Sequence, residues 1–188
     1  VPKSLDVTTQ GTCLIVGKTD VVLAAAEKLA DVLALTVLLE PGSEIAPSQA
    51  YDTVVGTLHQ ATGTLGRFEI RINAFQHSVT GGRGTPALTS AQDGAQSECD
   101  IILDLTGGSP LFPAPEKRDG YVRADPKSPT AVADAVFAAS QLVGTFEKPL
   151  YVRMEPSLCA HSRAGKPACS NCLNVCPTGA IVSAGDHV

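Results

Sequence analysis

The sequence has no excess of basic residues. It contains 14 Lys and Arg against 19 Asp and Glu, so the formal net charge is −5 and the isoelectric point is about 5.3. A surface that binds nucleic acid needs clustered lysine and arginine side chains. The charge therefore argues against nucleic acid as a partner.

Long apolar runs are also missing. The longest candidate, residues 33–39, is interrupted by Thr36 and followed by Glu40, whereas a membrane-spanning helix needs about 20 apolar residues. No charged head followed by an apolar body marks a secretory signal peptide. We therefore expect no membrane span and a cytoplasmic location. The first residue is Val1 rather than Met, which suggests that the chain starts at an internal cut.

Motifs for catalysis and nucleotide binding are absent as well. The sequence shows neither H-E-x-x-H nor a Ser/His/Asp nucleophile motif. A dinucleotide site needs G-x-G-x-x-G after the first strand, so that the backbone can approach the pyrophosphate. Residues 17–22 instead carry bulky side chains, and Asp20 places a carboxylate where a phosphate would lie. We assign no catalytic residue, and whether the chain is an enzyme stays open.

The residues that are present predict an α/β fold. Residues 12–17 form an apolar run typical of a buried strand, residues 21–33 favour a helix with Asp20 as its N-cap, and residues 35–40 favour a second strand. A strand, a helix and a strand with short joins predict a βαβ unit of a parallel sheet. We expect a Rossmann-like parallel-sheet scaffold.

Further elements follow from the same patterns. Strands are expected over residues 68–73, 99–105 and 150–153, a loop over 80–86, a charged surface excursion with several prolines over 111–129, and a helix over 129–143. Ser128 before Pro129 is the expected N-cap of that helix. Asp100 and Asp104 are expected to mark the ends of a strand. The predicted domains are an α/β scaffold over residues 10–148 and an incomplete ferredoxin-like segment over 149–188.

The six cysteines are unevenly distributed. Cys13 and Cys99 stand alone in apolar, strand-like contexts, where we expect small buried side chains. The other four lie between Cys159 and Cys176. This distribution is unlike a disulfide framework and indicates a metal site in a reducing compartment.

The clustered cysteines have the spacing Cys159-x9-Cys169-x2-Cys172-x3-Cys176-Pro177. A two-residue spacer lets one tight loop present two sulfurs, and C-x3-C-P is the final step of the bacterial ferredoxin motif. We therefore predict that all four thiolates bind a 4Fe–4S cluster. The nine-residue first spacer departs from the ferredoxin pattern, so the assignment of Cys159 has less support than that of the other three.

Alternative interpretations stay open. A structural zinc site could use the same thiols, although such sites usually have two C-x2-C pairs or a Cys/His pair; the chain would then be an interaction or assembly module. Cysteines free of any metal would be prone to oxidation. His161 is expected to be a loop residue rather than a ligand. A flavin-dependent oxidoreductase domain is a further alternative.

Only 12 residues follow Cys176, and none of them is cysteine. In two-cluster ferredoxins the last cysteine of the motif ligates the other cluster. We therefore expect further cysteine motifs beyond Val188. A fragment that ends there can lack the cluster or hold zinc in its place.

Residues 111–126, 141–153 and 158–163 resemble bacterial cytosolic proteins described as 4Fe–4S ferredoxin-type iron–sulfur-binding proteins. The resemblance covers nearly the whole chain. It implies Cys159, Cys169, Cys172 and Cys176 as cluster ligands, and a longer chain with further cysteine motifs as the partner of this segment. It implies no reaction or substrate.

A weaker resemblance is to the flavin-carrying subunit of heterodisulfide reductases, in which a βαβ unit, a Gly-x-x-Gly-x-Phe strand and a ferredoxin insert follow in similar order. Residues 63–68 match that strand, but the glycines of a dinucleotide site are missing. The sequence thus predicts an electron-transfer module with protein redox partners, in which the α/β part is a scaffold or docking domain.

Overall fold

The structure is a computed structural model that describes residues 4–45, 48–79, 87–112, 118–149, 155–176 and 181–183. The chain divides into two compact units. The larger unit contains residues 6–113 and 117–146, and the smaller unit contains residues 1–5, 114–116 and 147–188. The loop predicted at 80–86 and the strand predicted at 150–153 lie outside the described residues.

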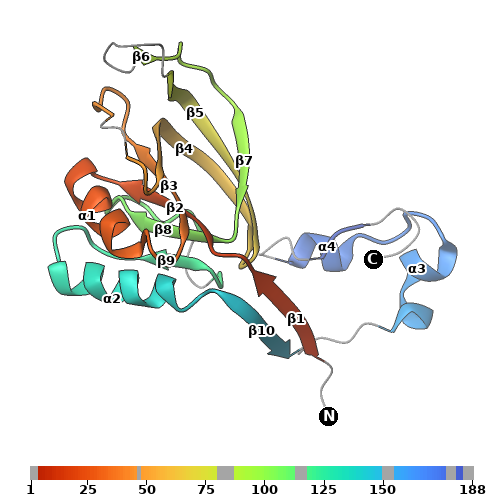
Figure 1. The fold of residues 1–188 in the computed structure, drawn as a ribbon. Helices are drawn as coiled ribbons and strands as arrows, with labels where there is room; N and C mark the ends of the chain where they lie inside the picture. The colour runs from red at the N-terminus through yellow and green to blue at the C-terminus, as the bar shows by residue number, and fades with distance from the viewer. Residues whose placement is uncertain are drawn as a thin grey trace. The chain divides into compact units, whose positions relative to one another are not determined.

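The larger unit has an α/β fold, as predicted, built on one mixed sheet (Figure 1). Its strands are β2 (Thr12–Gly17), β3 (Ala34–Leu39), β4 (Asp52–Thr64), β5 (Arg67–Val79), β6 (Ala87–Leu88), β7 (Ala95–Cys99), β8 (Ile101–Leu105) and β9 (Tyr121–Arg123). Their order is β6-β5-β4-β3-β2-β8-β9, and β7 also pairs with β5. In the series β4-β3-β2-β8-β9, each strand is parallel to its neighbour. β5 is antiparallel to β4, β6 and β7.

The predicted βαβ unit is confirmed: α1 (Thr19–Leu29) connects the parallel strands β2 and β3. Lys18 is the N-cap residue, so the prediction of Asp20 as the cap is wrong. Asp20 lies in the first turn, where its carboxylate interacts favourably with the helix dipole. The helix ends at Leu29, earlier than predicted, and Leu33 is buried beyond it.

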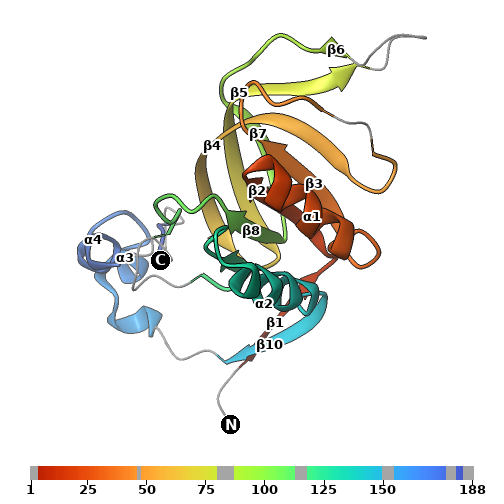
Figure 2. The same cartoon turned by 90° about the vertical axis from the view of Figure 1, so that its left-hand side faces the viewer.

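The second helix, α2 (Pro129–Ser140), begins as predicted. The Ser128 hydroxyl accepts a hydrogen bond from the N–H of Ala131 at 3.3 Å, and Pro129 occupies the first turn. The helix ends at Ser140, three residues before the predicted end. Helices α1 and α2 lie side by side on one face of the sheet (Figures 1 and 2).

The prediction of a single strand over 99–105 is wrong. Strands β7 and β8 are separated by Asp100, whose Oδ2 accepts hydrogen bonds from the N–H groups of Gln10, Gly11 and Thr12 at 2.7, 2.9 and 3.2 Å. This carboxylate fixes the chain where it changes direction. β7 then pairs with β5 and β8 pairs with β2, so the two strands have different neighbours.

Part of the predicted surface excursion is also structured. Tyr121–Arg123 forms β9, which pairs in parallel with β8, and Phe112 and Ala124 are buried. β9 extends the sheet and lies next to the buried carboxylate of Asp104. The described part of the excursion therefore contributes a strand and buried side chains to the α/β unit.

The larger unit has two apolar layers. One lies between the sheet and the helices and includes Ile15, Val22, Leu29 and Ile101. The other lies on the opposite, inner face of the curled sheet and contains Leu14, Val16, Leu38, Phe68, Ile70, Ile72, Cys99, Ile102 and Phe112. Alternate residues of β2 enter different layers, because neighbouring side chains of a strand point to opposite faces.

Strands β1 (Ser4–Thr9) and β10 (Gly144–Pro149) form a separate two-stranded sheet. The smaller unit contains the short 3₁₀ helix η1 (Pro156–Leu158) and the one-turn helices α3 (Ala160–Ala164) and α4 (Asn171–Val175). Among the described residues, no helix has the length and apolar character required to cross a membrane.

Candidate functional site

The four predicted ligands lie in and between the short helices of the smaller unit. Cys159 is the N-cap residue of α3, Cys169 lies in the connection between the helices, Cys172 is in α4 and Cys176 directly follows it. Cys172 is exposed, and the other three are half-buried. None forms a disulfide.

The backbone around Cys159 favours its thiolate. The N–H of Ser162 lowers the pKa of this thiol, and the N–H of His161 contributes in the same direction, because both stabilise the charged sulfur. The helix turns after Ala164 through Gly165, whose φ is +59°. Since thiolates rather than thiols bind metals, Cys159 is chemically prepared to be a ligand.

His161 was expected in a loop, but it lies within α3, and its side chain is buried. Its Nδ1 lies 3.4 Å from the carbonyl oxygen of Cys169, and its Nε2 lies 3.2 Å from the hydroxyl of Ser183. The imidazole therefore links α3 to the chain around Cys169. With both nitrogens engaged, it offers no free lone pair to a metal in this conformation.

Across the described ranges, no three His, Cys, Asp or Glu side chains are arranged to hold a metal ion. The structure therefore does not gather the cysteines into a site, and the ligand set stays a prediction. The donor chemistry does fit the group: four thiols with ferredoxin-type spacing are the usual ligands of a 4Fe–4S cluster.

A second candidate region is the carboxyl edge of the parallel strands, where α/β proteins commonly bind ligands. A cavity of about 220 Å³ there is lined by residues at the ends of β2, β3 and β8, by residues of β4 and by the loop after β8, including Gly17, Glu40, Asp104 and Thr106. A Cβ at Gly17 would lie 2.5 Å from the carbonyl oxygen of Leu105. This glycine therefore has a packing role that does not depend on any ligand.

Asp104 is almost fully buried at this edge. Its Oδ1 accepts hydrogen bonds from the N–H and the hydroxyl of Thr106 at 2.9 and 2.6 Å, and its Oδ2 accepts one from the Tyr121 hydroxyl at 2.5 Å. Arg123 Nε lies 3.6 Å from Oδ2. Burial and the bond to Asp104 raise the pKa of Tyr121. Asp104 is the penultimate residue of β8 and so lies near a strand end, as expected, and it is in addition a buried anchor for β9.

One signal in the sequence could have revealed this anchor. A carboxylate within the otherwise apolar run of residues 101–105 needs a partner if the strand is buried, because charged side chains are almost never buried alone. The partners Tyr121 and Arg123 lie in the segment interpreted as a solvated excursion. The hydrogen bond of Tyr121 explains why that segment returns to the sheet.

The two remaining cysteines are buried, as predicted. Burial raises the pKa of Cys99 to about 12 and raises the pKa of Cys13 further. Both thiols therefore stay protonated near neutral pH, and protonated thiols neither bind metals nor attack electrophiles efficiently. These residues act as small core side chains.

The fold and the cysteine segment define an α/β domain combined with a short helical segment that carries four closely spaced thiols. No protein-family model and no curated protein matches the sequence. The functional assignment therefore depends on the residues of this chain.

Proposed function

We propose that this chain is an electron-transfer module whose C-terminal segment holds a 4Fe–4S cluster through Cys159, Cys169, Cys172 and Cys176. The C-x2-C-x3-C-P spacing is the observation that carries this proposal. A bound cluster would supply one-electron transfer, with a potential set by hydrogen bonds to sulfur and by burial.

The contrast between the two groups of cysteines supports the proposal. Cys159 has a lowered pKa and Cys172 is exposed, so metal can reach these thiols and at least one of them readily forms a thiolate. Cys13 and Cys99 are buried and protonated. The chemistry suited to a cluster is thus concentrated in the segment with the ferredoxin-type spacing.

The proposal includes a cytoplasmic location, redox proteins as partners, and further cysteine motifs in a longer chain. A reducing compartment keeps clustered thiols available for metal. If Cys176 binds a second cluster, the other ligands of that cluster would come from those additional motifs. The α/β unit is then the scaffold or docking domain of the electron-transfer module.

The test compares cluster retention in cysteine variants. The protein is reconstituted under anaerobic conditions with ferrous iron and sulfide, and its iron and acid-labile sulfide are measured after gel filtration. Cys172→Ser is expected to lose most of both, because a hydroxyl is a poor ligand for the cluster. Ser170→Ala in the same segment and Cys99→Ala in the α/β unit are the matched controls and should retain the wild-type content.

Metal analysis and the absorption spectrum of the purified protein separate the alternatives. Zinc bound in preference to iron and sulfide would favour the interaction or assembly module, and co-purified flavin would favour the oxidoreductase domain. Iron and sulfide retained unchanged in Cys172→Ser would show that the ligand assignment is wrong.

A further inference from the structure

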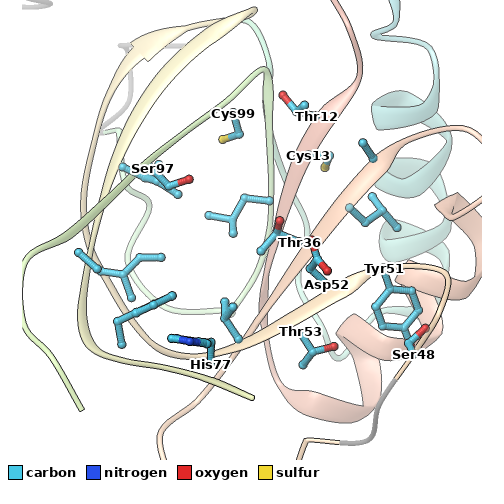
Figure 3. Close-up of a pocket in the computed structure, with 18 of the residues that line it drawn as sticks. Thr12, Cys13, Thr36, Ser48, Tyr51, Asp52, Thr53, His77, Ser97 and Cys99 are labelled. Atoms are coloured by element: carbon cyan, nitrogen blue, oxygen red, sulfur yellow. The ribbon is translucent and has the colours of Figure 1, made fainter. Parts of the chain in front are cut away.

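The larger unit contains a cavity of about 940 Å³ that the proposed electron-transfer function does not use (Figure 3). It lies inside the curled sheet, where residues of β2, β3 and β4 face residues of β5 and β7. Its volume is in the range of small-molecule sites, and the interiors and mouths of curled sheets are common places for them.

Strand register identifies the side chains that point into this space. Ile70 and Ile72 belong to the inner apolar layer, and their cross-strand partners on β7 are Ser97 and Ala95. Directly paired residues of neighbouring strands project from the same face of a sheet. Ser97 therefore points into the cavity together with Ile70.

The same argument applies on the opposite wall. Leu14 belongs to the inner layer, its partner on β3 is Thr36, and the partner of Thr36 on β4 is Asp52. Thr36 and Asp52 thus point to the side on which Leu14 lies, and Figure 3 shows both beside the open space. The walls combine an apolar base with a few polar groups.

This half of the interior is open because of the residues that line it. Elsewhere in the inner layer the interior is filled by large side chains, with the rings of Phe68 and Phe112 5.9 Å apart. Beside the cavity, inward positions of β3 and β7 hold the smaller Thr36, Ala95 and Ser97. These three side chains leave unfilled a volume that larger side chains would occupy.

The charge of the lining restricts what can bind. Asp52 contributes a carboxylate, and no lysine or arginine occurs among the described lining residues. The thiol of Cys99, also in the wall, is protonated because burial raises its pKa. An anionic ligand would meet the Asp52 carboxylate without a compensating lysine or arginine, and a charged group on the apolar base would be desolvated at high cost.

We propose that this cavity binds an uncharged, mainly apolar small molecule, with its apolar body against Leu14, Ile70 and Ile72 and its polar group near Thr36 and Ser97. The arrangement matches the usual composition of small-molecule sites, an apolar surface with few polar groups that set orientation. The assignment concerns the α/β unit alone and is independent of cluster binding.

The test uses two probes that share an anilinonaphthalene body: uncharged N-phenyl-1-naphthylamine and anionic 8-anilino-1-naphthalenesulfonate. Binding to the whole chain is followed by NMR of isotope-labelled isoleucine methyl groups. The uncharged probe is expected to shift Ile70 and Ile72 and to leave Ile15 and Ile101 unchanged, since the latter two lie in the apolar layer on the other face of the sheet. The anionic probe is expected to bind at least about tenfold more weakly.

A variant provides the second readout. Ser97→Phe places an aromatic ring in the cavity and should weaken binding of the uncharged probe by about tenfold or more. Thr62→Phe, at an exposed position of β4 outside the cavity lining, is the matched control and should leave affinity unchanged. Unperturbed Ile15 and Ile101 methyl shifts in Ser97→Phe verify that it folds.

Three results would overturn the proposal. These are unchanged Ile70 and Ile72 shifts at saturating uncharged probe, equal affinity for the anionic probe, or unaltered binding in a folded Ser97→Phe variant. A shift of all four isoleucines together would also contradict it, because that pattern reports general adsorption or unfolding rather than occupancy of the cavity.

Discussion

At the scale of single residues, the cysteines of this chain differ in chemistry because of their surroundings. Cys13 and Cys99 have raised pKa values through burial, and Cys159 has a lowered pKa through the backbone N–H of Ser162. A thiol with a lowered pKa stays deprotonated to lower pH than ordinary cysteine, and one with a raised pKa stays protonated to higher pH. Cys159 should therefore react faster with thiol-modifying reagents than Cys13 and Cys99.

We predict that iodoacetamide modifies Cys159 of the folded, reduced, metal-free protein at least about tenfold faster than Cys13 or Cys99 near neutral pH. As the pH falls, the Cys159 reaction should persist below the ordinary thiol pKa of about 8.5. Peptide mass spectrometry over a pH series measures each site, and a urea-unfolded sample provides the control, in which Cys13 and Cys99 should react normally. Equal rates at Cys99 and Cys159 in the folded protein would contradict the account.

Asp104 shows how one buried charge organises a neighbouring segment. Asp104→Asn removes the charge that accepts bonds from Tyr121 and Thr106 and that faces Arg123. We predict that it lowers the free energy of unfolding by about 2–4 kcal/mol, the usual cost of disrupting a buried charged network. Urea denaturation followed by circular dichroism measures the change.

The matched control for this prediction is Asp134→Asn, which makes the same substitution at an exposed position of α2. Exposed substitutions usually change stability by less than about 0.5 kcal/mol. If Asp104→Asn and Asp134→Asn have the same midpoint, the anchoring role of Asp104 is wrong.

At the scale of elements, the connection between β2 and α1 depends on a close backbone approach. Gly17 has φ +152°, and a Cβ there would lie 2.5 Å from the Leu105 carbonyl oxygen of β8. Gly17→Ala must therefore push β2 and β8 apart. We predict a loss of about 1–3 kcal/mol in the free energy of unfolding, the range seen for overpacked positions.

Gly108→Ala is the control for this change, because its Cβ would meet only the Thr106 hydroxyl at 3.6 Å, an ordinary contact. Urea denaturation of both variants provides the comparison. A Gly17→Ala protein as stable as the Gly108→Ala protein would show that the two strands can separate without cost.

The elements also show what local sequence patterns can predict. β2, α1, β3 and α2 follow from apolar runs, helix-forming residues and the Ser128 cap, all of which are local. Residues 99–105 form one continuous run, and nothing local shows that the Asp100 carboxylate binds the backbone of residues 10–12 and divides it. Such long-range hydrogen bonds are invisible to periodicity.

β9 and the cavity cannot be predicted from the sequence for a related reason. The segment around Tyr121 contains prolines and charges, a composition typical of surface segments, although its contacts with Asp104 bring it into the sheet. The open interior depends on which alternate positions of β3 and β7 hold Thr36 and Ser97, and thus on the register between strands. For Cys159, Cys169, Cys172 and Cys176, the spacing in the sequence predicts four sulfur ligands of one metal site. That ligand set stays a prediction, because the described residues are not gathered around a metal position.

At the scale of the whole molecule, the chain combines an α/β unit with a segment of clustered thiols. The α/β unit has two apolar layers and its own hydrogen-bonded anchors, which are sufficient to explain its fold without a cofactor. Cluster binding would instead order the short helices of the other unit, since metal binding commonly contributes directly to folding. In the proposed function, the α/β unit is the scaffold and the segment of clustered thiols carries the electron transfer.

Low-temperature electron paramagnetic resonance of the anaerobically reconstituted, dithionite-reduced protein tests that assignment most directly. We predict the paramagnetic signal of a reduced 4Fe–4S cluster, reversible on reoxidation and absent from Cys172→Ser. A protein that binds zinc in place of iron and sulfide, and gives no such signal after reconstitution, would contradict the central claim.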